Sequence, residues 1–72
     1  MKISVIMDDR VVIVNGEPRK LESMIGSKNV HAIQWYGDYG ELEYKSSLIS
    51  NKYIEWEDVK PYYEAWKNVK KS

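Results

Sequence analysis

The first third of the chain alternates short apolar runs with polar turns. Residues 3–7 (ISVIM) and 10–14 (RVVIV) are rich in β-branched side chains and short, which predicts two strands joined at Asp8-Asp9. Alternation along a two-residue hairpin places four side chains on one face: Ile3, Val5, Val12 and Val14. It places three on the other: Ile6, Val11 and Ile13. Because both faces are apolar, we expect a helix to cover one and sheet curvature or a partner chain to cover the other.

A second hairpin is predicted at Asn15-Gly16, because a type I′ turn requires positive φ at both central residues. The strand that follows is poor in hydrophobic residues. Pro18 cannot donate a hydrogen bond to a neighbouring strand, and its neighbours are charged, so only Leu21 suits burial. We therefore expect a short strand at a sheet edge, followed by a loop over residues 22–29.

In residues 52–72 the apolar period changes from 2 to 3.6, which predicts an amphipathic helix. Five side chains form its apolar stripe: Val59, Tyr62, Tyr63, Trp66 and Val69. Proline suits the first turn of a helix, so either the helix begins near Pro61 or a short turn over residues 55–60 leads into it. Lysines crowd the last turns and complement the helix dipole, so the helix should end near Lys71.

The most regular stretch is VHAIQWYGDYGELEYK, residues 30–45. We expect strands at 30–36 and 41–45, joined by an even number of loop residues, either 37–40 or 38–39 alone. With residues 37–40 as the loop, Trp35 pairs with Leu42 and Ile33 with Tyr44 on an apolar face. The polar face carries three further pairs: Gln34 with Glu43, Tyr36 with Glu41, and Ala32 with Lys45.

The predicted fold is therefore α+β: a small antiparallel sheet of about five strands, arranged as a hairpin meander, with one C-terminal helix packed on it. A chain of 72 residues forms one domain, 1–72, with a small core. It has no cysteine and a single histidine, so no disulfide and no closed structural zinc site is expected, and no motif indicates a cofactor. The remaining way to stabilise such a core is self-association or a protein partner.

Charge and hydropathy narrow the choice of partner. Eleven basic residues balance eleven acidic ones, which disfavours non-specific nucleic-acid binding and weakens self-repulsion. The longest apolar run, residues 11–14, is far shorter than a membrane span, and the N-terminal residues lack the features of a signal peptide. Whether the chain binds a small molecule stays open.

Several side chains could carry chemistry. His31 could be a general base or a pH switch, but it lies in a strand, on the face of Ile33, with no nucleophile beside it; we favour a half-buried structural role. Glu41 and Glu43 share a face, as paired catalytic carboxylates do, yet Lys45 beside them indicates solvated charges. Asp8, Asp9 and Asp38 could be cation ligands, but aspartate is equally common in turns, where its side chain hydrogen-bonds to the backbone. Because no calcium-loop spacing is present, we interpret all three as turn residues. We therefore expect no enzymatic activity.

The aromatic composition is unusual, with three Trp, six Tyr and no Phe. Tyr and Trp carry a polar group on a large apolar body, so they suit contact surfaces, although a small domain also uses them because most of its residues lie near water. We select Tyr36, Tyr39 and Trp56 as a candidate interaction surface. The partner would be a protein or, as the alternative, a sugar or nucleotide whose rings stack on these side chains.

Residues 29–44, NVHAIQWYGDYGELEY, resemble a segment of small proteins and modules encoded in the tail regions of tailed bacteriophages and prophages. In these, a segment like Val30 to Trp35 runs into a glycine-bounded turn and a strand of the form Gly-Glu-x-Glu-aromatic. The resemblance implies a non-enzymatic structural or assembly interaction module of a phage tail or virion, found in the virion or the host bacterial cytoplasm. It carries over no catalytic residue.

Overall fold

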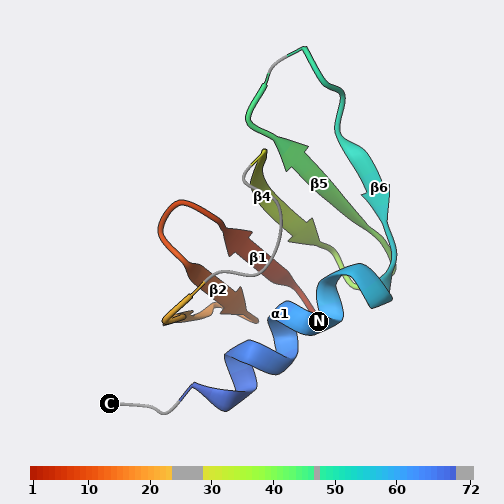
Figure 1. Cartoon of the computed structure of the whole chain (residues 1–72). Coiled ribbons are helices and arrows are strands. Elements are labelled where there is room, and N and C mark those ends of the chain that lie inside the picture. Colours follow the sequence, from red (N-terminus) through yellow and green to blue (C-terminus); the bar gives the residue numbers. More distant parts are fainter. Residues whose placement is uncertain (24–28, 47, 70–72) are drawn as a thin grey trace.

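The computed structural model describes residues 1–23, 29–46 and 48–69, and these form an α+β fold with one six-stranded antiparallel sheet and one helix on it, as predicted (Figure 1). The sheet is one strand larger than expected. The elements are β1 (Ile3–Ile6), β2 (Val11–Val14), β3 (Glu17–Lys20), β4 (Val30–Trp35), β5 (Gly40–Tyr44), β6 (Lys52–Ile54) and α1 (Trp56–Asn68).

The sheet consists of two three-stranded meanders that meet at β1 and β4. The spatial order is β3-β2-β1-β4-β5-β6, so the chain returns to the middle of the sheet after β3. β1 and β4 are antiparallel, with Ile3 opposite Trp35 and Val5 opposite Ile33. The predicted hairpins are thus present within each half, and the pairing of β1 with β4 joins the two halves into one sheet. Residues 24–28 of the predicted loop lie outside the described residues.

The first two hairpins follow their predicted faces. Ile3 lies opposite Val14 and Val5 opposite Val12, and these side chains are buried. The first turn contains four residues, 7–10, where two were expected, but an even loop length preserves the faces. The second turn is as predicted, with positive φ at Asn15 (50°) and Gly16 (87°).

Helix α1 starts five residues before Pro61, so the predicted start was wrong. The N-terminus of α1 is capped at Glu55, whose backbone N–H donates to the Asp58 carboxylate at 3.0 Å. Pro61 lies in the second turn, where it removes one intrahelical hydrogen bond. α1 ends at Asn68, before the predicted end near Lys71; residues 70–72 lie outside the described part of the chain.

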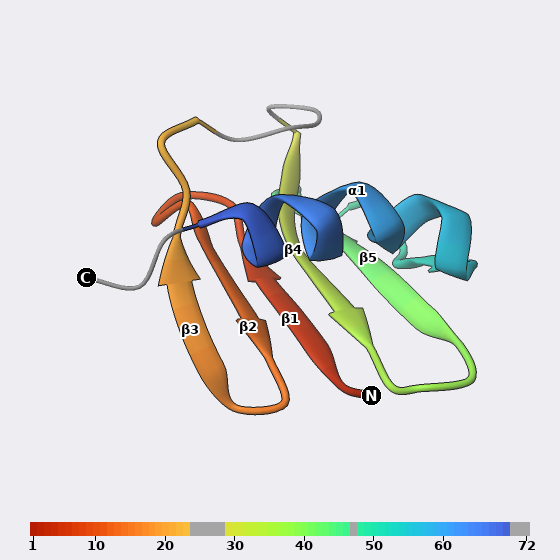
Figure 2. The same ribbon diagram turned by 90° about the horizontal axis from the view of Figure 1, so that it is seen from below.

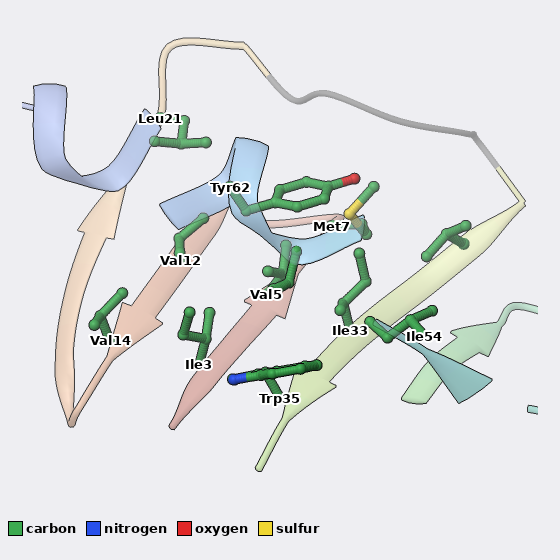
Figure 3. Packing of buried hydrophobic residues seen from close by; sticks show 12 residues of the cluster. Ile3, Val5, Met7, Val12, Val14, Leu21, Ile33, Trp35, Ile54 and Tyr62 are labelled. Atoms are coloured by element: carbon green, nitrogen blue, oxygen red, sulfur yellow. The ribbon is translucent and has the colours of Figure 1, made fainter. Parts of the chain in front are cut away.

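The core lies between α1 and one face of the sheet, and Figure 2 shows the helix crossing that face from β5 toward β3. Ile3, Val5 and Ile33 point from the central strands toward the helix, with Tyr62 above them (Figure 3). The predicted helical stripe packs here: Val59 and Tyr62 are buried, and Tyr63, Trp66 and Val69 are partly buried against the core. On the opposite sheet face, Ile6, Val11 and Ile13 are half-buried, and none of the described elements covers them.

Edge strand β3 is attached to the end of α1 by polar contacts. The guanidinium group of Arg19 donates to the backbone carbonyl of Trp66 at 2.9 Å and pairs with the Glu17 carboxylate at 2.6 Å. It also lies 3.8 Å from the centre of the Trp66 ring, whose indole N–H donates to the Glu17 carbonyl at 2.9 Å. These contacts compensate for the few apolar side chains of β3.

Candidate functional site

From Ala32 to Trp35 the central hairpin keeps its predicted faces opposite β5, but it has a different register. Trp35 lies opposite Gly40 and Ile33 opposite Leu42, a shift of two residues from the predicted pairs. Gly40 belongs to β5 and not to the loop, which comprises residues 36–39. A Cβ atom at Gly40 would lie 2.8 Å from the Trp35 ring and 3.1 Å from Ile54. The shift therefore places the residue without a side chain under the indole.

This register brings three exposed tyrosines together where the loop between β4 and β5 lies beside β6. The backbone N–H of Tyr36 donates to the carbonyl of Tyr39 at 2.8 Å and closes the loop. The ring centres of Tyr36 and Tyr39 lie 5.1 Å apart, and those of Tyr39 and Tyr53 lie 6.1 Å apart. Tyr53 projects from β6 and is 75% exposed. We call Tyr36, Tyr39 and Tyr53 the tyrosine cluster.

Beside this cluster, where β6 leads into α1, lies a groove of about 530 Å³. Four aromatic side chains line it: Trp35, Tyr39, Tyr53 and Trp56. Three carboxylates and one aliphatic side chain complete the lining: Asp38, Glu55, Glu57 and Ile54. We call this site the aromatic groove. Trp56 is held in place by Trp35 and Tyr63, with 5.7 Å between ring centres in each pair.

The structure therefore brings the three selected aromatic residues close together. Tyr39 and Trp56 line the same groove, and Tyr36 contacts Tyr39. Tyr53 was missed, because residues 52–54 were assigned to the region of helical period. The available signal for a strand was the pair of residues with high strand propensity, Tyr53-Ile54, between polar residues on both sides.

The environment of Tyr36 favours its neutral phenol. Desolvation by the surrounding groups raises the pKa of Tyr36, and the nearby Glu41, Tyr39 and Glu43 raise it further because a second negative charge beside them is unfavourable. At neutral pH Tyr36 thus presents a hydroxyl group that can both donate and accept hydrogen bonds.

The other candidates form no reactive arrangement in the described residues. His31 was expected near the core margin, but it lies at an irregularity between Val30 and Ala32 and is exposed, while Val30 takes the buried position. Glu41 and Glu43 share the face opposite α1 and are half-buried. Asp8 forms an ion pair with Lys45 at 3.1 Å, and within residues 1–23, 29–46 and 48–69 no group of acidic or histidine side chains is arranged to hold a metal ion.

Comparisons of the chain with protein-family models, with curated proteins and with solved structures find no match. Among the described residues, no helix combines the length and apolar character needed to cross a membrane. The geometry of the tyrosine cluster and the aromatic groove is therefore the basis for a functional proposal.

Proposed function

We propose that this chain is a non-enzymatic protein-interaction module of phage or prophage origin, which acts in a tail or virion or in its assembly. The observation that carries the proposal is the tyrosine cluster. Its three neighbouring rings, 44%, 50% and 75% exposed, form a continuous aromatic surface at the loop between β4 and β5 and at edge strand β6. Tyrosine supplies a large, rigid contact area and a polar group, and it is enriched at the energetic centres of protein interfaces.

The resemblance of residues 29–44 to phage tail-region proteins supports the biological setting. The same residues include two members of the tyrosine cluster, Tyr36 and Tyr39, so the resemblance and the cluster concern the same part of the chain. The small core supports a role in association, because a domain of this size gains stability by burying surface against a partner. Equal numbers of acidic and basic residues permit such contacts without strong self-repulsion.

Co-expression with individual tail and virion proteins from neighbouring genes tests the proposal. Affinity capture on the tagged chain should retain at least one of them, and Tyr39→Ala and Tyr53→Ala should weaken retention. Leu48→Ala is the matched control, since this apolar side chain is 93% exposed in a different loop. A stable monomer that retains none of these proteins would contradict the proposal.

Ring stacking of a small ligand is the second candidate, favoured by the convergence of Tyr39, Tyr53 and Trp56 on one groove. A sugar ring could lie on these faces, whereas the phosphate of a nucleotide would meet the carboxylates of Asp38 and Glu57. Tryptophan fluorescence during titration with oligosaccharides and oligonucleotides distinguishes the two functions. A saturable change with a sugar supports ligand binding, and no change with either class leaves the protein-interaction function.

A further inference from the structure

The aromatic groove combines π-faces with negative charge. Its lining includes the rings of Tyr39, Tyr53 and Trp56 and three carboxylates, and no lysine, arginine or histidine of the described residues belongs to it. Asp38, Glu55 and Glu57 are exposed, so their charges face the solvent at the entrance to the groove. Aromatic faces attract cations through the ring quadrupole, and carboxylates add a Coulombic attraction for the same charge.

Elsewhere in the chain an aromatic ring and a carboxylate already bind a guanidinium group. The guanidinium group of Arg19 lies 3.8 Å from the centre of the Trp66 ring and pairs with the Glu17 carboxylate at 2.6 Å. At the groove, none of the described cations takes the equivalent place over Trp56, since the cation–π contacts in residues 1–23, 29–46 and 48–69 involve Trp66 and Tyr63. The groove thus has the partners of a guanidinium group without the group itself.

Strand β6 supplies a way to present such a group. It is the last strand of the sheet order, so one side of its backbone has no neighbour among the described strands, and Figure 1 shows it at the sheet edge next to the start of α1. Tyr53 and Ile54 of this strand line the groove. An extended segment that pairs with the free edge of β6 would therefore place its side chains beside the groove.

We propose that the aromatic groove binds an arginine side chain presented by an extended segment of the protein partner. This inference rests on the proposed interaction function and specifies the chemistry of the partner. Arginine fits better than lysine, because its planar guanidinium group stacks on aromatic rings while its edge donates hydrogen bonds to carboxylates.

Titration of the ¹⁵N-labelled chain with a blocked peptide that alternates glycine and arginine tests the inference. The matched probe replaces each arginine by citrulline, which has nearly the same shape but no charge. We expect the arginine peptide to shift the indole N–H signals of Trp35 and Trp56. The indole signal of Trp66, which already donates to Glu17, should stay in place. Binding should weaken as the salt concentration rises from about 0.01 M to about 1 M, where charges are screened within roughly 3 Å.

Neutral substitutions identify the carboxylates involved. Asp38→Asn and Glu57→Gln should each weaken binding of the arginine peptide roughly two- to fivefold, the size of an exposed charge pair. Asp9→Asn is the control for net charge, because Asp9 is exposed in the turn between β1 and β2 and does not line the groove.

Three results would overturn the inference: no shift of Trp56 with the arginine peptide, equal shifts with the citrulline peptide, or equal weakening by Asp9→Asn and Asp38→Asn. Failure here is separable from failure of the proposed function. If a virion protein binds the chain but the arginine peptide does not, only the partner chemistry is wrong. If the peptide binds and no virion protein does, the interaction function in phage particles is wrong.

Discussion

Substitution of Gly40 by alanine tests the register that creates the candidate site. An added Cβ would lie 2.5 Å from the Gln34 backbone oxygen and 2.8 Å from the Trp35 ring, both below van der Waals contact. Neither neighbour is a flexible side-chain end, so β4 or the indole must move. Overpacking of this kind costs about 1–3 kcal/mol. Since a domain of this size has a stability of roughly 3–5 kcal/mol, the variant should lose about half of it.

Urea denaturation followed by tryptophan fluorescence measures this loss. Gly16→Ala is the informative control, because nothing lies within 4 Å of its added Cβ and the cost arises from a φ of +87° alone, about 1 kcal/mol. A Gly40→Ala variant within about 0.5 kcal/mol of the parent chain would refute the argument, because a residue in an open loop would tolerate the methyl group. That result would favour the register in which Trp35 pairs with Leu42.

Three further predictions concern stability. Arg19→Lys should lower the free energy of unfolding by about 1–3 kcal/mol, because an ammonium group cannot reach the Trp66 carbonyl and Glu17 together. Denaturation curves measure this loss, and Lys20→Met, a substitution at an exposed position of the same strand, is the control. Burial raises the pKa of Tyr62 above its ordinary 10.0, so its neutral phenol stabilises the fold fully below about pH 10 and this contribution is lost as the pH rises through the folded-state pKa. Tyr62→Phe should therefore reduce the alkaline loss of stability in denaturation curves, and equal losses in both proteins would exclude this role. Tyr53→Ala should change stability by less than about 0.5 kcal/mol, because the ring is 75% exposed; a larger loss in thermal unfolding would assign Tyr53 to folding.

The sequence predicted those parts of the fold that depend on neighbours along the chain. Alternation predicted the faces of β1 and β2, and the backbone requirement of a type I′ turn predicted the bend at Asn15-Gly16. Pro18 correctly indicated an edge strand, because a residue without an N–H leaves no hydrogen bond unmade where it faces away from the neighbouring strand. The predicted start of α1 was wrong, because the helix accommodates Pro61 in its second turn and begins earlier, at a cap formed by Glu55 and Asp58.

The register of the central hairpin depends on a distant strand. Glycine at position 40 suits a loop by local rules, but its position under Trp35 is also set by Ile54 of β6, which packs against the same point. The candidate site likewise depends on β6. Tyr36, Tyr39 and Trp56 could be selected as aromatic residues suited to a surface, whereas their proximity to one another follows from β6, which also adds Tyr53.

Helix α1 is the last of the described elements to be synthesised. Its 13 residues follow the six described strands in the sequence, yet they cover the core of both meanders. The last turn of the helix accepts a hydrogen bond from Arg19 of β3. On the ribosome, the strands emerge first, with the apolar face of Ile3, Val5 and Ile33 still open to water and to chaperones. We therefore expect cooperative folding only after α1 has left the exit tunnel, and we expect a nascent chain stalled before Trp56 to remain sensitive to proteases and prone to aggregation.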